Sequence, residues 1–328
     1  MTAIRHLEVK EGEAGIRLDR WLKRRFPKLT QGHLQKLLRT GQLRVDGRRA
    51  EASSRLETGQ TVRVPPLATD RDDGGRSKPP PPQRLSGADV AFIKSLVLTD
   101  DGTVVALNKP AGLATQGGSK TVRHVDRLLP ALDLASERCR LVHRLDRDTA
   151  GLLILARGAE AAAHLTEAFR HQRVEKLYWA IVRGRVKEPR GLINMALEKQ
   201  GGAGRERMKG SDAGKPAKTL FHVVGHAGRI ATWLALRPLT GRTHQLRVHC
   251  AAIGHPILGD MKYGGDRPPL NAQPEGLMLF AREARLPHPK GFSMHLEAPL
   301  AAHLKSCFEW LGFEESGGRE HDLQALAT

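Results

Sequence analysis

The sequence contains few of the residues that cross-link a chain or anchor it in a membrane. It has three cysteines in 328 residues, an odd number without the spacing of a disulfide framework. This argues against a small disulfide-stapled secreted protein and fits a reducing compartment, so we expect a cytoplasmic protein. No segment approaches the ~18 consecutive apolar residues that a bilayer-spanning helix needs. We therefore predict neither export nor a membrane partner.

Aromatic residues are also scarce, at 4% of the chain, whereas basic residues are in excess. The 53 Lys and Arg residues against 35 Asp and Glu residues give a formal net charge of +18, spread along the whole sequence. Such a surplus indicates a polyanionic partner, and nucleic acid is the first candidate. With so few aromatic side chains, binding would depend on charge more than on stacking platforms. The alternative is a basic protein with no such partner.

A Pro- and Gly-containing stretch divides the chain. Residues 67–88 include four consecutive prolines and a polar DRDDGGR run, which is typical of a semi-extended linker. We predict a small module at residues 1–66, a larger domain at residues 89–312 and a polar C-terminal tail at residues 313–328.

The small module has the pattern of two helices followed by short strands. Apolar positions recur on one face from Leu18 onward, and Thr30 can cap a second helix that ends at Gly41. A hairpin turn is expected at Asp46-Gly47. Its 15 basic and 7 acidic residues give a net charge of +8, which suits contacts with phosphates. The expected RNA-binding residues are Arg17, Arg20, Lys36, Arg39 and Arg44; a solvated basic face without a partner is the alternative.

The larger domain alternates between strand and helix patterns. We predict an α+β fold, in which helices flank a mostly antiparallel mixed sheet. The expected strands are residues 103–107, 141–145, 152–156, 176–182, 219–224, 230–236 and 292–296. The expected helices are residues 159–172, 243–254 and 300–311.

Three polar segments interrupt this apolar framework. In residues 141–151, Arg144 and Asp146 would share one face if the strand continues. Such a charged run is costly to bury unpaired, so it lies at a surface turn or in a site. In residues 242–250, Arg247 lies at the edge of an apolar helical stripe, where it can reach a buried carboxylate or point into solvent. In residues 176–184, Tyr178 is either a packing residue or part of a site.

Together these segments resemble the signature of the RluA family of pseudouridine synthases. The resemblance rests on NKPAG at residues 108–112, HRLDRDTAG at 143–151, GRTHQLRVH at 241–249 and HPILGDMKYG at 255–264. The small module resembles the alpha-L RNA-binding domain of a small-subunit ribosomal protein. Its matching runs are RLDRWL at 17–22, LLRTGQLRVDG at 37–47 and GQTV at 59–62. Ala150 and Gln116 depart from the serine and the histidine that are usual at these family positions.

The resemblance implies the pseudouridine synthase catalytic fold and a set of site residues. The implied catalytic residues are Asp146, Tyr178 and Arg247, with Arg247 pairing with the aspartate. The implied substrate-binding residues are Arg144, Leu246, His143, Lys109, Arg242 and His244. It also implies a ribosomal RNA partner, most naturally that of the large subunit. We expect a monomer that needs neither a cofactor nor a metal.

The implied reaction detaches a uracil base from its sugar at N1, turns it and rejoins it through C5. Asp146 would either attack the sugar or remove a sugar proton, and the sequence leaves both routes open. Tyr178 would stack on the uracil and take the proton from C5. The uridine must leave its helix to react, and Arg144 would contact the RNA where the base has been flipped out.

Three other functions are consistent with parts of the sequence. A glycoside hydrolase could use Asp146 and Asp148, but it needs one carboxylic acid kept protonated, and the flanking arginines favour the ionised form. An RNA-binding protein without activity is a second alternative, against which the intact Asp146, Tyr178 and Arg247 count. A zinc enzyme is the third, and its ligands would come from Cys139, His143, His244, His249 and Cys250, which lack a CxxC pair or an HExxH helix.

Overall fold

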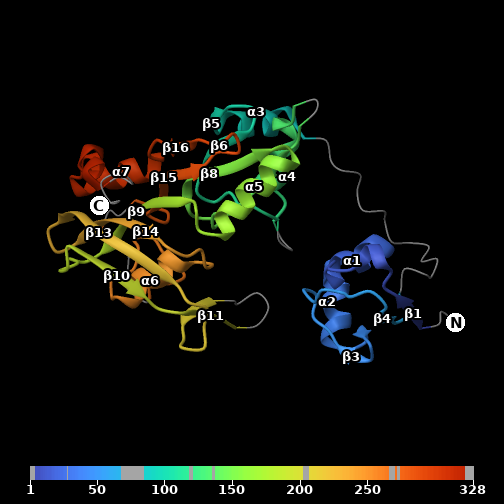
Figure 1. The fold of residues 1–328 in the computed structure, drawn as a ribbon. Helices are drawn as coiled ribbons and strands as arrows, with labels where there is room; N and C mark the ends of the chain where they lie inside the picture. Colours follow the sequence, from blue (N-terminus) through green and yellow to red (C-terminus); the bar gives the residue numbers. More distant parts are fainter. Residues whose placement is uncertain are drawn as a thin grey trace. The chain divides into compact units, whose positions relative to one another are not determined.

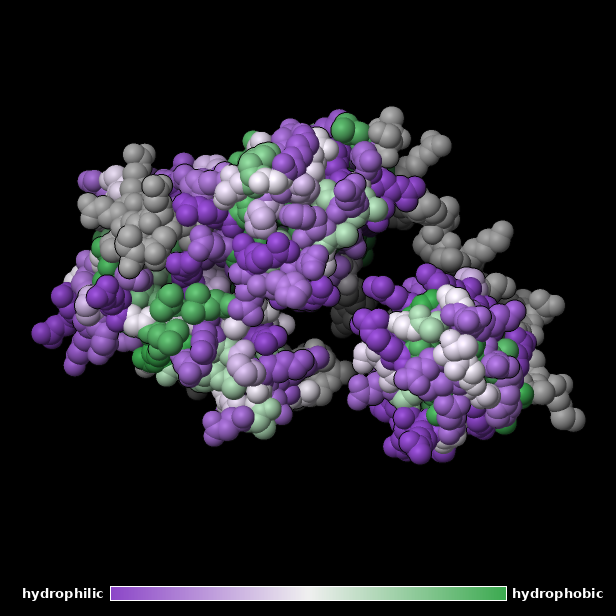
Figure 2. All heavy atoms as spheres, in the orientation of Figure 1, coloured by the Kyte–Doolittle hydropathy of each residue, from purple (hydrophilic) through white to green (hydrophobic). Residues whose placement is uncertain are grey.

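The computed structural model describes residues 4–27, 29–67, 85–117, 121–134, 137–201, 207–265, 270–271 and 274–321. The chain divides into two compact units, Met1–Gln83 and Arg84–Thr328. Each unit has a hydrophobic core of its own. Most of the predicted linker at residues 67–88 lies outside the described residues. Figure 2 shows that hydrophilic side chains cover most of the visible face of both units.

The N-terminal unit packs two helices against a small sheet (Figure 1). Its elements are β1 (Arg5–Glu8), η1 (Glu11–Glu13), α1 (Leu18–Arg25), α2 (Gln31–Arg39), β2 (Arg44–Val45), β3 (Arg48–Arg49) and β4 (Thr61–Val64). The strands are ordered β1-β4-β2-β3. As predicted, the Thr30 hydroxyl accepts a hydrogen bond from the His33 N–H at 3.3 Å and so caps α2. Asp46 and Gly47 both have positive φ values, 48° and 75°, as the predicted hairpin turn requires.

In the described part of the larger unit, ten strands form one mixed sheet. The strand order is β10-β13-β14-β9-β15-β8-β6-β5, with β16 beside β15 and β7 beside β8. Its strands are β5 (Val97–Asp100), β6 (Val104–Lys109), β7 (Cys139–Leu141), β8 (Ala150–Arg157), β9 (Glu175–Arg183), β10 (Arg190–Asn194), β13 (Lys218–Ala227), β14 (Ala231–Pro238), β15 (Leu279–Pro287) and β16 (Ser293–Glu297). A separate hairpin is formed by β11 (Leu197–Gln200) and β12 (Arg207–Gly210).

One pair in this sheet runs parallel, and it lies at the centre. β8 pairs with β15 in parallel through Phe280–Ala150 and Ala281–Gly151, whereas the neighbouring pairs on either side are antiparallel. Every residue of β8 is buried, which explains its continuous apolar run. The fold is therefore the predicted mostly antiparallel mixed sheet flanked by helices.

The helices and helical turns of this unit cover the sheet (Figure 1). They are α3 (Gly87–Ser95), α4 (Val125–Leu128), η3 (Leu129–Leu132), α5 (Gly158–Arg170), α6 (Gln245–Ala252), α7 (Ala302–Leu311) and η4 (Glu315–His321). Helix α5 packs on β7, β8 and β15, whereas α6 packs on β14 and on the β12 strand of the hairpin. Within the described ranges, no helix is both long enough and apolar enough to cross a bilayer.

Two features differ from the sequence-based expectation. The strand predicted at residues 141–145 ends at Leu141, because the charged run that follows turns away from the sheet. The described part of the predicted polar tail, residues 313–321, folds back on the sheet. There Phe313 lies 5.8 Å from the ring of Trp233, and Glu315 forms an ion pair with Arg282 at 3.0 Å.

Candidate active site

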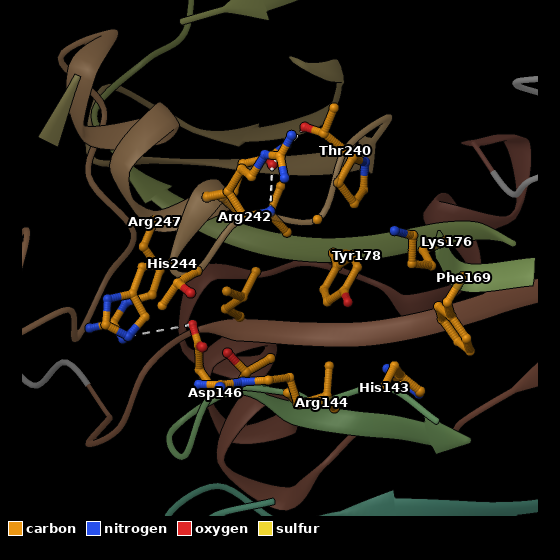
Figure 3. A pocket seen from close by; sticks show the side chains of 18 of the residues that line it. His143, Arg144, Asp146, Phe169, Lys176, Tyr178, Thr240, Arg242, His244 and Arg247 are labelled. Carbon is orange, nitrogen blue, oxygen red and sulfur yellow. Dashed lines mark hydrogen bonds and ion pairs between the residues drawn. The ribbon is translucent and has the colours of Figure 1, made fainter. Parts of the chain in front are cut away.

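A pocket of about 280 Å³ opens where the centre of the sheet meets α6 (Figure 3). Its walls come from the loop between β7 and β8, the first half of β9, the start of β15, the end of α5 and the loop that leads from β14 into α6. This volume is close to ~300 Å³, the lower limit of small-molecule sites. The pocket can therefore hold a single nucleotide base, but it is too small for a duplex. The predicted residues that line it are His143, Arg144, Asp146, Tyr178, Arg242, His244, Leu246 and Arg247.

The loop that carries Asp146 is held by hydrogen bonds to its backbone. The buried Thr115 hydroxyl donates to the Leu145 carbonyl at 2.8 Å and accepts from the Leu145 N–H at 3.1 Å. The Thr149 N–H donates to the Asp146 carbonyl at 3.3 Å. The carboxylate keeps 19% of its side-chain surface exposed, so it is fixed in place and still open to the pocket.

Lys109 does not bind substrate in the way the sequence suggested. Its side chain is 0% exposed and does not line the pocket. The ammonium donates hydrogen bonds to the carbonyls of Pro110, Leu113 and Arg147, at 3.0, 2.9 and 3.1 Å. Burial lowers the pKa of Lys109 to about 8, against the opposing charges of Asp148 and Asp146. Lys109 therefore ties the residue that follows Asp146 to the 110–113 turn.

The expected pair between Arg247 and Asp146 is also corrected. The Arg247 guanidinium binds Asp260 through two parallel hydrogen bonds of 2.7 Å, and no nitrogen of Arg247 lies within 4.0 Å of an Asp146 oxygen. Burial alone would raise the pKa of Asp260, but the Arg247 hydrogen bonds and charge lower it overall. Asp146 still contributes to raising the pKa of Arg247, so the two charges act on each other across the pocket.

The side chain that faces Asp146 directly is His244. Its Nε2 lies 3.9 Å from an Asp146 oxygen (Figure 3). Its Nδ1 lies 2.7 Å from the Tyr263 hydroxyl. The Tyr263 oxygen accepts from the Met208 N–H at 3.0 Å, so its own proton is free to go to Nδ1. This assignment leaves the proton of neutral His244 on Nε2, toward the carboxylate. Burial lowers the pKa of His244, while the Asp146 charge opposes that shift.

Tyr178 forms the middle of the pocket. It lies on β9, and its side chain is half-buried. Burial raises the pKa of the Tyr178 hydroxyl well above its usual range, and the negative charge of Asp146 raises it further. Tyr178 is therefore a neutral phenol at physiological pH. The Leu246 side chain, 7% exposed, adds an apolar wall.

Across the pocket from Asp146 and His244 lie His143, Phe169 and Lys176 (Figure 3). The His143 ring stacks on Phe169 with centroids 4.3 Å apart and accepts a hydrogen bond from the Ile154 N–H at 2.8 Å. Burial lowers the pKa of His143 to about 3, with a further contribution from the Lys176 charge. His143 is thus a neutral wall residue that also anchors the loop to β8.

Two arginines lie at the exposed part of the pocket. Arg144 is exposed and, within the described part of the chain, forms no hydrogen bond or ion pair. Arg242 donates from Nε to the Pro216 carbonyl at 3.1 Å.

Among the described residues, no group of His, Cys, Asp and Glu side chains could hold a metal ion. Asp148, the second carboxylate of the glycosidase alternative, does not line the pocket.

The predicted RNA-binding residues of the small unit, Arg17, Arg20, Lys36, Arg39 and Arg44, are all exposed. Arg17 forms an ion pair with Asp19 at 2.7 Å, and Arg44 donates to the carbonyls of Gly41 and Gly47. Their contact with RNA stays a prediction.

Sequence reasoning missed Lys176, Phe169, Asp260 and Tyr263 as parts of the site. The two-residue spacing of Lys176 and Tyr178 on a predicted strand already places both on one face. Asp260 and Tyr263 belong to the HPILGDMKYG run, but nothing in that run indicates that it returns to Arg247 and His244.

Comparisons with known proteins identify the family and the domains of this chain. Residues 103–252 match the RNA pseudouridylate synthase family, and residues 16–62 match the S4 domain. The ribosomal large subunit pseudouridine synthase C of Vibrio cholerae is 34% identical over 308 residues, which cover 93% of this chain and 96% of that protein. The Escherichia coli protein of the same name is 34% identical over 94% of this chain and 97% of its own length.

Among solved structures, human RNA pseudouridylate synthase domain containing 4 superposes with a TM-score of 0.59 at 26% identity. The match covers 69% of this chain and 98% of the human one. The fold, the pocket and the extent of these matches lead to one conclusion: the chain belongs to the RNA pseudouridylate synthase family and carries an N-terminal S4 domain.

Proposed function

We propose that this enzyme converts specific uridines of large-subunit ribosomal RNA to pseudouridine, with Asp146 as the catalytic carboxylate. The observation that carries the proposal is the position of Asp146 in a one-base pocket, opposite the Nε2 of His244 and beside Tyr178. The substrate class is supported by relatives named for the large ribosomal subunit and by the excess of basic residues. Such a substrate places the enzyme in the cytoplasm.

The proposed reaction begins at the sugar. Asp146 either attacks the sugar or removes a sugar proton, and in both routes the N1–C1′ bond breaks and its electron pair remains on the uracil. The base turns and C5 bonds to C1′, while the bond between Asp146 and the sugar breaks or, in the other route, the sugar proton is returned. The proton leaves C5, and N1 takes up a proton in its place. Because the substrate and the product are isomers, the balance needs no oxidant, nucleotide or metal.

We assign Tyr178 first to stacking on the everted uracil. Its raised pKa keeps the hydroxyl protonated, so it can take the C5 proton only if its own proton leaves in the same step. Arg144, exposed and unpaired among the described residues, is suited to occupy the place that the base vacates in the RNA. We expect the enzyme to act as a monomer.

Mapping pseudouridine across ribosomal RNA from cells with and without the protein tests activity and substrate together. We expect discrete large-subunit sites to lose the modification when the protein is absent. An unchanged map would contradict the proposed substrate. Release of free uracil by the purified enzyme would instead favour a glycosidase.

Asp146→Asn tests the assigned residue. Loss of the ionised group should lower the single-turnover rate by about 10²-fold or more, because Asp146 is the only carboxylate among the described residues that line the pocket. RNA affinity should stay within a few-fold of wild type, since the surrounding basic residues supply binding. A variant that loses RNA binding together with activity would show that Asp146 is structural.

A further inference from the structure

Lys176 is a lysine of the pocket to which the proposed mechanism assigns no role. It precedes Tyr178 by two residues on β9, so both side chains leave the strand on the same face. Lys176 is half-buried and lines the same pocket as Asp146. In Figure 3, Tyr178 lies between Asp146 and Lys176, and the Lys176 ammonium points toward the middle of the pocket.

Within the described ranges, the Lys176 ammonium forms no hydrogen bond and no ion pair. Other cations of the site have partners: Arg247 binds Asp260, and Lys109 donates to three carbonyls. Burial lowers the pKa of Lys176, and its charge extends far enough to lower that of His143. A partly desolvated ammonium without a counter-charge costs stability, which is a reason to look for its partner in the substrate.

The order of side chains along the pocket indicates which part of the substrate Lys176 would meet. Asp146 acts at the sugar, and the neutral ring of Tyr178 supports the base. A uracil stacked on that ring with its C1′ toward Asp146 directs its far carbonyl edge to the Lys176 side. Phe169 and His143, stacked with ring centroids 4.3 Å apart, form a neutral wall there. The carboxylate of Glu283, on the neighbouring strand β15, lines an adjoining cavity with Lys176, but among the described residues it forms no ion pair with the ammonium.

We propose that Lys176 is a further catalytic residue, whose ammonium binds a uracil carbonyl and stabilises the base as it leaves the sugar. When the N1–C1′ bond breaks, its electron pair makes the uracil an anion, with charge shared by N1 and the carbonyl oxygens. The ammonium keeps its proton throughout and acts by electrostatic attraction and hydrogen bonding. As C5 bonds to C1′, the charge disappears and the interaction weakens. The inference rests on the proposed role of Asp146 at the sugar.

The test compares two substrates in single-turnover reactions with an RNA fragment that contains a mapped target uridine. Lys176→Met removes the charge and keeps the length of the side chain. We expect a rate about 10²–10³-fold below wild type on uridine, with RNA affinity unchanged, the loss typical of removing one group that stabilises developing charge. On the same RNA with 5-fluorouridine the defect should shrink at least ten-fold, because fluorine itself stabilises the anionic base. The rate measured there is loss of the original N1 linkage.

Two variants serve as controls. Lys187→Met removes an exposed lysine of the same domain and should leave both rates unchanged. Lys176→Arg keeps the charge and should retain much more activity than Lys176→Met. Urea unfolding of all variants identifies any that are misfolded, and Lys176→Gln replaces Lys176→Met if that variant is unstable.

The outcomes separate this inference from the proposed function. Conversion of uridine by the wild-type protein establishes the function whatever Lys176 does. An equal defect on both substrates, or a loss confined to RNA affinity, would overturn the inference and favour a structural role or a phosphate contact. A Lys176→Met variant as fast as wild type would overturn it outright.

Discussion

Arg247 and Asp260 show how the site keeps a charge in place where water is largely excluded. The Asp260 side chain is 0% exposed, and besides its two bonds to Arg247 it accepts from the backbone N–H groups of Lys262 and Tyr263, at 2.9 and 3.0 Å. These bonds link α6 to the 260–263 turn, and Tyr263 in turn orients His244. We infer that Arg247 acts on the reaction mainly by positioning this turn and by its charge toward Asp146.

Asp260→Asn should therefore be destabilising and should change the acid response. Loss of the anion leaves Arg247 buried without a counter-charge, which typically costs about 3–5 kcal/mol. The folded-state pKa of Asp260 lies below its ordinary value, so its contribution to stability is full above about pH 4–5 and is lost as the pH falls. Urea unfolding between pH 3 and pH 7 should show a shallower acid decline in the variant than in wild type.

Asp212→Asn, at an exposed carboxylate, is the matched control and should follow the wild-type curve. A parallel acid decline in wild type and Asp260→Asn would show that the Arg247 pair does not govern stability in this range.

For individual residues, the sequence motifs predicted which side chains lie together in the site, but not which of them form ion pairs or hydrogen bonds with one another. Asp146, Tyr178 and Arg247 converge on one pocket, as the resemblance implied. The partner of Arg247 could not be foreseen, because Asp260 lies 13 residues further along the chain and is brought back only by tertiary packing. Lys109 was misassigned because a lysine in a polar turn gives no sign in sequence that three carbonyls enclose it.

At the scale of elements, the parallel contact between β8 and β15 depends on Gly151. This residue has φ +105°, and a Cβ there would lie 2.3 Å from the Ala281 carbonyl oxygen. Gly151 is also the second residue of β8, directly after the loop that carries Asp146. The close approach of the two strands and the placement of the catalytic loop therefore depend on the same missing side chain.

Gly151→Ala should lower both stability and activity. The atoms that the new Cβ would meet belong to the backbone of β15, so β8 and β15 must move apart. This should lower the free energy of unfolding by about 1–3 kcal/mol, in addition to the strain of an alanine at positive φ. Gly102→Ala is the control, since Gly102 has φ +82° and a Cβ at that residue would meet no atom within 4 Å. Urea unfolding should show a larger loss of stability for Gly151→Ala than for Gly102→Ala. Equal losses in the two variants would show that the close approach of β8 and β15 is not the cause.

Elements with strong periodicity or continuous apolar character were predictable. Helix α5 and strands β9, β14 and β16 lie within about two residues of the expected bounds. Strand β1 gave no signal, because its residues are mostly exposed and it exists only through pairing with β4. The β11–β12 hairpin could not be predicted from the sequence either, because the run Gln200 to Lys218 has the composition of a surface loop.

At the scale of the whole molecule, the chain divides into two compact units, and we predict that the smaller one contributes to RNA binding. Deleting residues 1–66 should weaken RNA binding and make it less sensitive to salt, because this unit carries a net charge of +8 from 15 basic and 7 acidic residues. For each phosphate that the shortened protein no longer neutralises, the slope of log affinity against log salt should fall by about 0.7–0.9. Titrations at several salt concentrations measure that slope.

The full-length variant Arg20→Gln/Lys36→Gln/Arg39→Gln provides the control for deletion of a whole unit. It should reduce the slope in the same direction while leaving the fold intact, since all three side chains are exposed. An unchanged slope in both proteins would remove the RNA-binding role assigned to this unit.

The enclosure of Lys109 has a consequence for chemical labelling of the native protein. Burial lowers the pKa of this amine to about 8 only while it is enclosed, so a molecule in which Lys109 is exposed presents an ordinary lysine to acylating reagents. In the folded protein reagents cannot reach the Lys109 amine, because the side chain is 0% exposed. Acylation at this position thus marks molecules whose catalytic domain has opened, and its rate reports how often that opening occurs.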